Sequence, residues 1–332
     1  MQEKHLPLLQ CPKCILDLQL NISEKIHQRI KTGNLTCSSC KTSYPIMNFI
    51  PRFVPLENYA SNFGLEWNLH SRTQYDGSSK TSISLERFKK STQWPDNLKG
   101  EIILEAGSGS GRFTEHALKT NATVVSFDYS EAVEANYKSN GQYDNLLLVQ
   151  ASIYEMPLKP NSFDKVFCIG VLQHTPDPKK SMDCLKQTLK PNGSFVVDFY
   201  KTYTGLKGFL YNLLTTKHWV RPIANKISPP ILYKLCFYYV SFMWPLSKLI
   251  HKIPKIGKSL NWFLLIADYR GKYDLSEDQL KEWAILDTFD MLSPQYDCHQ
   301  TIPKLQKWLE ELNMKNIYVG FGGNGVEARA IK

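Results

Sequence analysis

The chain has 332 residues, of which 42% are hydrophobic, and this length fits about two units that each bury a core of their own. The first residues contain no apolar run followed by a small-residue cleavage site, which argues against secretion and predicts a cytoplasmic, reducing location. The net charge of +9 has two readings: contact with the phosphates of nucleic acid or lipid headgroups, or a solvated, mildly basic surface.

Four of the eight cysteines form two Cys-x-x-Cys pairs, Cys11 with Cys14 and Cys37 with Cys40, while the other four are single. This distribution predicts a metal site and ordinary buried thiols rather than a disulfide framework. Four thiolates complete a tetrahedral site without an open position, so we expect a structural zinc in a small ribbon over residues 1–56. The spacing between the pairs slightly exceeds the usual range, which a longer hairpin can absorb. Two disulfides or idle thiols remain the alternative.

Prolines punctuate residues 44–55, which we interpret as a linker, and residues 57–100 are expected to form a helical lead-in to the main domain. From residue 101 onward, short apolar runs alternate with helical patterns, which predicts an α/β fold with a mostly parallel sheet covered by helices. The expected parallel strands lie at 101–104, 122–127, 146–149, 165–169 and 194–197. A helix near 302–313 precedes two further strands, 316–319 and 326–330, which a glycine-rich turn joins into an antiparallel hairpin.

A helical insertion over about residues 203–275 is rich in aromatic and basic residues. Its most apolar part, 231–246, includes Lys234 and Pro245 and falls short of the ~18 uninterrupted apolar residues that a membrane span needs. We therefore predict no transmembrane span. The insertion is expected to form a lid over a pocket or, alternatively, a surface for peripheral membrane contact.

The first predicted strand is followed by a glycine-rich loop, Glu105-Ala106-Gly107-Ser108-Gly109-Ser110-Gly111-Arg112, and then by a helical segment. Glycines let the backbone turn sharply and let a ligand approach closely. A dinucleotide fingerprint would need glycine where Arg112 stands, and the phosphate loop of nucleotide hydrolases would need Gly-Lys-Ser/Thr. The second strand ends at Asp128, whose carboxylate can accept the two hydroxyls of a ribose or, alternatively, cap the next helix.

The acidic residue two positions before Gly-x-Gly-x-Gly resembles the first motif of class I S-adenosylmethionine-dependent methyltransferases. Two later segments, 168–178 and 189–194, resemble the branch of that family that methylates quinones, sterols and other small molecules, the type 11 methyltransferases. The resemblance covers about residues 57–332 and implies a Rossmann-like sheet with S-adenosylmethionine as cofactor. The implied cofactor-binding residues are Glu105, Gly107, Gly109, Gly111, Arg112, Asp128, Tyr129, Ser152, Ile153 and Gly170. Ser152 departs from the family, which often has aspartate there to contact the adenine amino group.

Methyl transfer from a sulfonium is an in-line displacement, so the enzyme must align the reactants, exclude water and, for some acceptors, supply a base. His174, just past the fourth strand, is the first candidate base, with a packing role as the alternative. Asp287, Tyr296, Asp297 and His299 are secondary candidates in a polar stretch, 282–301, that the resemblance places as a loop facing the acceptor, with capping and loop hydrogen bonds as the alternative. Phe63, Gly64 and Trp67 are expected to close over the cofactor.

The acceptor is expected to be a small molecule, a lipid or a glycan precursor. The alternative is an RNA methyltransferase whose ribbon contacts the substrate. The ribbon resembles both the small zinc protein that activates several eukaryotic methyltransferases and the zinc-binding head of certain ribosomal RNA guanine methyltransferases. A non-catalytic cofactor-binding scaffold is a further alternative, because Glu105 and Ser152 depart from the commonest residues.

Overall fold

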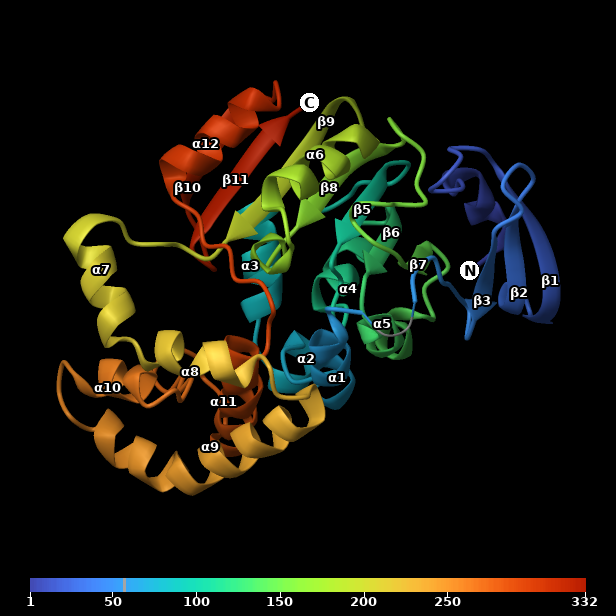
Figure 1. The fold of residues 1–332 in the computed structure, drawn as a ribbon. Coiled ribbons are helices and arrows are strands. Elements are labelled where there is room, and N and C mark those ends of the chain that lie inside the picture. Colours follow the sequence, from blue (N-terminus) through green and yellow to red (C-terminus); the bar gives the residue numbers. More distant parts are fainter. Residues whose placement is uncertain (56–57) are drawn as a thin grey trace.

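The computed structural model describes residues 1–55 and 58–332 and contains a seven-stranded and a four-stranded sheet (Figure 1). The order of the larger sheet is β10-β11-β9-β8-β5-β6-β7. Its first five strands in the chain run parallel, and β11 is antiparallel to both β9 and β10. These strands are β5 (Ile102–Ala106), β6 (Thr123–Asp128), β7 (Leu146–Gln150), β8 (Phe163–Cys168), β9 (Leu189–Phe199), β10 (Lys315–Phe321) and β11 (Val326–Ile331). This architecture confirms the predicted Rossmann-like α/β fold with a C-terminal antiparallel hairpin.

The parallel strands are apolar on both faces because helices cover both sides of the sheet. Leu104 and Val125 point into a core shared with α6 (Pro178–Thr188) and α12 (Ile302–Glu311). The alternate residues Ile103 and Val124 pack with α3 (Ile83–Thr92), α4 (Arg112–Leu118) and α5 (Ala132–Asn140). The period-two pattern of the strands therefore divides their side chains between two cores.

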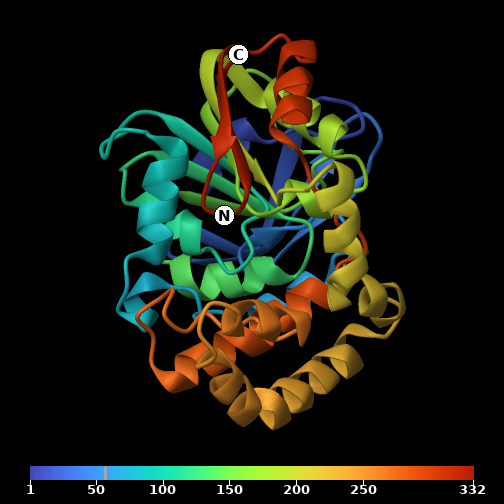
Figure 2. The ribbon, with the colours of Figure 1, turned by 90° about the vertical axis from the view of Figure 1, so that its left-hand side faces the viewer.

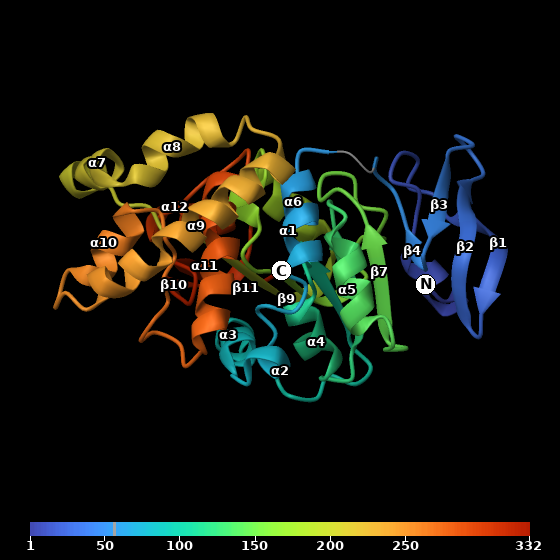
Figure 3. The ribbon, with the colours of Figure 1, turned by 90° about the horizontal axis from the view of Figure 1, so that it is seen from below.

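The N-terminal sheet is antiparallel, in the order β1-β2-β3-β4, and stands at the β7 edge of the larger sheet (Figures 1 and 3). Its strands are β1 (Leu18–Ile26), β2 (Arg29–Cys37), β3 (Ser43–Met47) and β4 (Ile50–Pro51), and a short helix, η1 (Glu3–Leu8), precedes them. The prediction of a linker over residues 44–55 is wrong where the chain forms β3 and β4. The sheet accommodates proline at these positions because a proline carbonyl oxygen can still accept a hydrogen bond. Pro45 O accepts one from Arg52 N at 2.9 Å.

The ribbon is continuous with the main domain rather than tethered to it. Arg52 pairs in parallel with Gln150 at the end of β7, and Phe53 N donates to Gln150 O at 2.9 Å. Gln10 N donates to Pro157 O at 2.9 Å, and ribbon side chains such as Leu35 belong to the same hydrophobic core as Leu104. The predicted boundary between residues 56 and 57 lies outside the described residues.

Helices gather beyond the carboxyl ends of the parallel strands, away from the ribbon (Figures 1 and 3), and Figure 2 shows them from the side. Two of them, α1 (Ser61–Leu69) and α2 (Asp76–Ser79), come from the lead-in. The others are α7 (Gly205–Leu214), α8 (Thr216–Ala224), α9 (Pro229–His251), α10 (Gly257–Phe263) and α11 (Glu277–Leu292). None of the helices in the described part of the chain is long and apolar enough to cross a bilayer.

The first half of the polar stretch 282–301 is helical, so the expectation of a loop there is wrong up to Leu292. A capping box starts α11: the Ser276 hydroxyl accepts from Gln279 N, and the Gln279 side chain accepts from Ser276 N. Only residues 293–301 form the loop that leads to α12.

Candidate active site

The glycine-rich loop lies between the end of β5 and the start of α4, and its three glycines adopt positive φ angles that disfavour other residues. Gly107 (φ +75°) and Gly111 (φ +91°) also lack space for a side chain. A Cβ on Gly107 would lie 2.4 Å from a methyl group of Val171, and one on Gly111 would lie 2.2 Å from Asn136 Oδ1. The loop is thus held close to the segment after β8, and glycine is required for that approach.

Asp128 lies at the carboxyl end of β6, beside the loop, and its pKa is raised because the carboxyl is buried. Its Oδ2 accepts from Gly109 N at 2.9 Å, while Oδ1 accepts from Ser130 N at 2.8 Å and from Ser130 Oγ at 2.7 Å. Each carboxylate oxygen has two lone pairs, so Oδ2 keeps one for a ligand hydroxyl. The residue both holds the loop and presents an acceptor to the adjoining cavity.

A cavity of about 1630 Å³ opens over the loop and extends under the insertion helices. Its lining includes most of the residues predicted to bind the cofactor: Gly107, Gly109, Arg112, Asp128, Tyr129, Ile153 and Gly170. Phe63 and Trp67 of α1 also line it, and the Trp67 indole lies 3.1 Å from the position of a Cβ on Gly109. Gly64 instead allows α1 to approach Glu131, because a Cβ on residue 64 would lie 3.1 Å from Glu131 N.

Glu105, Gly111 and Ser152 do not belong to the lining among the described residues. The Glu105 carboxylate turns inward, where it accepts from Thr114 Oγ1 and, at 2.7 Å, from Ser126 Oγ. Burial raises the pKa of Glu105 to about 7. Ser152 Oγ accepts from Tyr154 N at 3.2 Å. Here Glu105 and Ser152 hold the polypeptide around the cavity and do not face it.

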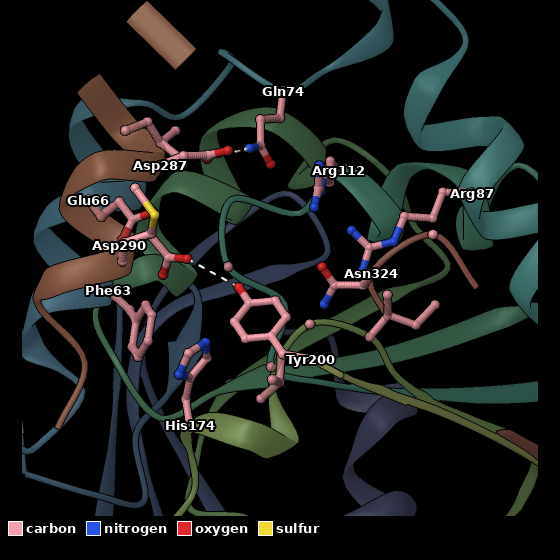
Figure 4. A pocket seen from close by; sticks show the side chains of 18 of the residues that line it. Phe63, Glu66, Gln74, Arg87, Arg112, His174, Tyr200, Asp287, Asp290 and Asn324 are labelled. Atoms are coloured by element: carbon pink, nitrogen blue, oxygen red, sulfur yellow. Dashed lines mark hydrogen bonds between the residues drawn. The ribbon is translucent and has the colours of Figure 1, made fainter. Parts of the chain in front are cut away.

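His174 lines the cavity at the end of η2 (Leu172–His174), with Phe63 and Tyr200 on either side of its ring (Figure 4). Its Nδ1 lies 3.1 Å from Tyr296 O, and because a carbonyl oxygen only accepts, Nδ1 carries the proton and Nε2 the lone pair in the neutral ring. Burial is the main cause of a lowered pKa for this imidazole. His174 is therefore neutral at physiological pH, with a basic nitrogen available.

The cavity also holds a group formed by Glu66 of α1, Asp287 and Asp290 of α11, and Tyr200 after β9 (Figure 4); of these, only Asp287 was among the residues predicted from the sequence. Tyr200 donates from its hydroxyl to Asp290 Oδ2 at 3.2 Å. Burial raises the pKa of Asp287 to about 7 and keeps the pKa of Tyr200 well above its usual value. The position of Tyr200, directly after a parallel strand, was a usable signal for a pocket residue. The sequence around Glu66 gave no indication of a pocket residue, because helices that are distant in sequence bury its side chain.

Glu66 is fully buried, and neither carboxylate oxygen has a hydrogen-bond partner within the described residues. Burial, followed by repulsion from Asp290 and Asp287, raises its pKa well above the ordinary value. The folded state therefore binds this proton more tightly than the unfolded state, so the stability it contributes is present at low pH and is lost as the pH rises toward the folded-state pKa.

We expect Glu66→Gln to make the protein more stable than the wild type at alkaline pH, because an amide cannot ionise. The gain should grow by about 1.4 kcal/mol per pH unit between the unfolded and folded pKa values of Glu66. Urea denaturation at several pH values measures it, with exposed Glu155→Gln as the matched control. A pH-independent difference between Glu66→Gln and wild type would contradict the raised pKa.

Asp297 lines the cavity but is the centre of an ion-pair group. Its Oδ2 lies 2.8 Å from Lys217 Nζ and 2.7 Å from Arg221 Nη1, and its Oδ1 lies 2.9 Å from His299 Nε2. The hydrogen bond from His299 and the nearby charges hold the pKa of Asp297 far below its usual value despite burial. A carboxylate held in this way is a poor proton acceptor, and it ties α8 to the 293–301 loop.

The four cysteines of the N-terminal pairs converge, with their Sγ atoms all within 4.8 Å of one another. Cys11 Sγ lies 3.8 Å from Cys40 Sγ, which is about the edge of a tetrahedron whose metal–sulfur bonds are ~2.3 Å long. The two turns are alike, since Ile15 and Lys41, each four residues after the first cysteine of its pair, adopt positive φ angles. The nine-residue strands β1 and β2 span the long separation between the pairs. The donor set fits a tetrahedral, thiolate-binding metal such as zinc.

Part of the chain is similar to known methyltransferases. Residues 104–197 match the family model described as a methyltransferase domain. The ubiquinone biosynthesis O-methyltransferase of Pasteurella multocida is 30% identical over 128 residues, which are 35% of this chain and 52% of that protein. The enzyme of the same name from Idiomarina loihiensis is 29% identical over 129 residues, 37% of this chain and 51% of that protein. The chain thus spans about half the length of the curated relatives it matches.

A solved structure, a putative S-adenosyl-L-methionine-dependent methyltransferase from Methanococcus maripaludis, is 13% identical with a TM-score of 0.44. That alignment covers 84% of this chain and 96% of the other.

Proposed function

We propose that this chain, whose residues 104–197 form a methyltransferase domain, transfers the methyl group of S-adenosylmethionine to a small organic acceptor. The observation that carries the proposal is the cavity of about 1630 Å³, which runs from the glycine-rich loop to His174 and Tyr200. Pockets for a single drug-sized ligand enclose roughly 300–1,000 Å³, so this cavity has room for a donor and an acceptor together. The curated relatives named as ubiquinone biosynthesis enzymes support an acceptor of the small-molecule class.

In this proposal the donor lies along the carboxyl ends of β5, β6 and β7. The glycine-rich loop receives its amino-acid end, Asp128 accepts from its ribose hydroxyls, and Tyr129 and Ile153 pack beside its adenine. When bound, S-adenosylmethionine supplies an electrophilic methyl group on a sulfonium. Phe63 and Trp67 cover this end of the cavity and exclude water from the reacting centre. Glu105 and Ser152 act here as supports of the loop and of the β7 end.

We assign the role of base to His174, whose Nε2 would take the proton from an acceptor hydroxyl as the oxygen attacks. Tyr296 O fixes the tautomer that this step needs, and the Phe63 and Tyr200 rings fix the plane of the imidazole. Tyr200 keeps its own proton because burial raises its pKa, so it can orient the acceptor as a hydrogen-bond donor. Asp297 and His299 are positioning residues in this scheme.

We expect His174→Gln to lower the rate of methyl transfer by roughly 10²–10⁴-fold while leaving donor binding unchanged. In the wild type the rate should rise with pH through a pKa below 6.5 and stay level near neutrality, since the lowered pKa keeps His174 unprotonated there. A pH–rate profile and donor calorimetry measure both effects. His299→Gln is the control and should keep the acid limb of the profile. A profile unchanged by His174→Gln would remove this base assignment.

Labelled-methyl transfer into fractionated cell extract tests the function as a whole. We expect label in the small-molecule or lipid fraction. Label confined to RNA would favour the alternative in which the ribbon contacts nucleic acid, and the absence of label in every fraction, with donor binding intact, would favour a scaffold. The ribbon stands at the β7 edge and the insertion helices at the other end of the molecule (Figure 3), which supports a structural role for the ribbon over acceptor contact.

We further propose that Cys11, Cys14, Cys37 and Cys40 bind a structural zinc. Four thiolates leave no position open for water or substrate, so the metal would hold the fold together without taking part in catalysis. We also retain residues 1–56, 57–100 and 101–332, with the insertion at 203–275, as the proposed division of the chain.

A further inference from the structure

The positive charge of the chain is concentrated in the insertion. Residues 199–267 contain ten Lys and Arg residues and no Asp or Glu, which leaves 30 basic against all 31 acidic residues in the rest of the chain. This segment therefore carries the whole net charge of +9. Lys226, Lys234, Lys252 and Lys255 are exposed and form no ion pair within the described part of the chain.

The longest helix of the insertion, α9, is apolar on two opposite faces. Leu232, Cys236, Val240 and Trp244 face inward and are buried. The outward face carries a stripe spaced by three and four residues: Ile231, Leu235, Tyr238, Phe242, Leu246 and Leu249, with Phe242 82% exposed. A helix that is hydrophobic all round is normally buried in a core or in lipid, and this one is covered on one side only.

Two other helices of the insertion also expose large apolar side chains. Leu206 and Phe209 of α7 are 75% and 63% exposed, and Trp219 and Ile223 of α8 are 62% and 70% exposed. Patches of this extent mark an interaction surface. Aromatic and aliphatic side chains beside lysines are typical of helices that lie in the interface of a membrane. A second copy of the chain fits poorly, because two such basic segments would repel each other.

Apolar residues of the insertion also line the cavity. Leu210 and Leu214 of α7 and Trp262 and Phe263 of α10 line the cavity, and all four are also exposed large hydrophobic residues. At these four residues the lining of the cavity is apolar and reaches the exposed surface of α7 and α10.

We propose that α7–α10 dock the protein on the surface of an anionic lipid bilayer, with the cavity opening toward the lipid. The apolar side chains enter the headgroup and acyl boundary, and the exposed lysines contact the phosphates. The consequence for the acceptor rests on the proposed function: an acceptor with an apolar tail reaches His174 from the lipid layer without passing through water.

Co-sedimentation with vesicles tests the docking without any substrate. We expect the full chain to bind phosphatidylcholine vesicles that contain phosphatidylglycerol, and to bind pure phosphatidylcholine vesicles much more weakly. The double variant Phe242→Glu/Leu249→Glu should bind the anionic vesicles at least about a hundredfold more weakly, because two outward apolar side chains become charged. Ile15→Glu/Ile26→Glu on the ribbon, where both side chains are exposed, is the matched control and should bind as the wild type does.

The electrostatic part is tested by charge reversal. Lys234→Glu/Lys252→Glu/Lys255→Glu should weaken binding to the anionic vesicles by at least about a hundredfold, since each lysine near the surface contributes about 1 kcal/mol. The matched control reverses three exposed lysines elsewhere, Lys41, Lys138 and Lys315. It has the same net charge as the first triple variant and should bind the anionic vesicles almost as the wild type does. Equal losses in the two triple variants would show attraction by net charge alone and would overturn a docking surface on the insertion.

Two further measurements separate the outcomes. Sedimentation velocity without vesicles should give a monomer, and a dimer that Phe242→Glu dissociates would assign this face to a second copy and overturn the proposal. S-adenosylmethionine should bind the Phe242→Glu/Leu249→Glu variant normally, so loss of vesicle binding is distinguishable from failure of the proposed methyl-transfer function. A wild type that ignores both kinds of vesicle would also overturn the docking proposal.

Discussion

Replacing Gly107 with arginine should abolish binding of S-adenosylmethionine in a calorimetric titration. Gly107 has φ +75°, which costs about 1–2 kcal/mol for a residue with a Cβ, and that Cβ would lie 2.4 Å from Val171. The loop would have to move away from the segment after β8, and the arginine side chain would occupy the space meant for the donor. A loss of at least about a hundredfold in affinity, or about 2.7 kcal/mol, is the expected minimum.

Two variants guard this experiment against misfolding. Gly77→Arg is the matched control, because Gly77 has no neighbour within 4 Å of its Cβ position, and this variant should bind the donor normally. Asp128→Ala removes the proposed ribose acceptor from the neighbouring strand and should also abolish binding. Melting temperatures of all three report folding separately. Unchanged donor binding in folded Gly107→Arg and Asp128→Ala would sink the cofactor assignment.

The glycine-rich loop and Asp128 could be found from sequence because their constraints are local. A strand, a turn with positive φ and a carboxylate at the next strand end lie within 24 residues of chain, from Glu105 to Asp128. The parallel strands could be found for a related reason: each is buried on both faces, so it appears as an uninterrupted apolar run.

Where side chains point was harder to infer. Glu105 stands at the acidic position of the family's motif, yet its carboxylate turns toward Thr114 and Ser126, whose positions depend on how α4 and β6 pack. The prolines around Pro45 and Pro51 suggested a linker, because local preference does not reveal that backbone carbonyls at these positions complete a sheet. In both cases tertiary packing decided an orientation that the motif left open.

The acidic end of the cavity illustrates contacts that no local pattern contains. Glu66 lies on α1 and Asp290 on α11, more than 200 residues apart, and only the packing of these helices makes them neighbours. In sequence, Glu66 looks like an ordinary solvated charge on a short helix. Its raised pKa follows from burial, which the sequence of α1 alone does not predict.

Removal of the proposed zinc is expected to unfold the ribbon and to weaken donor binding as well. Apparent binding energies of structural zinc in small thiolate sites are about 10–16 kcal/mol, more than a short four-stranded sheet can replace by packing. We expect one zinc per chain by metal analysis, its loss in Cys37→Ser, and rapid proteolysis within β1–β3 after chelation. Cys184→Ser, outside the cluster, is the matched control and should keep the metal. A purified chain with two disulfides and no zinc would contradict the assignment.

The effect on donor binding follows from a chain of contacts between the ribbon and the cavity. Arg52, after β4, donates to Gln150 Oε1 at 2.8 Å, and Gln150 Nε2 donates to Tyr129 O at 3.2 Å. Tyr129 lines the cavity at the proposed adenine end. Arg52→Ala, which leaves the four cysteines intact, should therefore weaken donor binding without loss of zinc. If it alters neither donor affinity nor the melting temperature, the ribbon does not position this part of the site, and its role lies elsewhere.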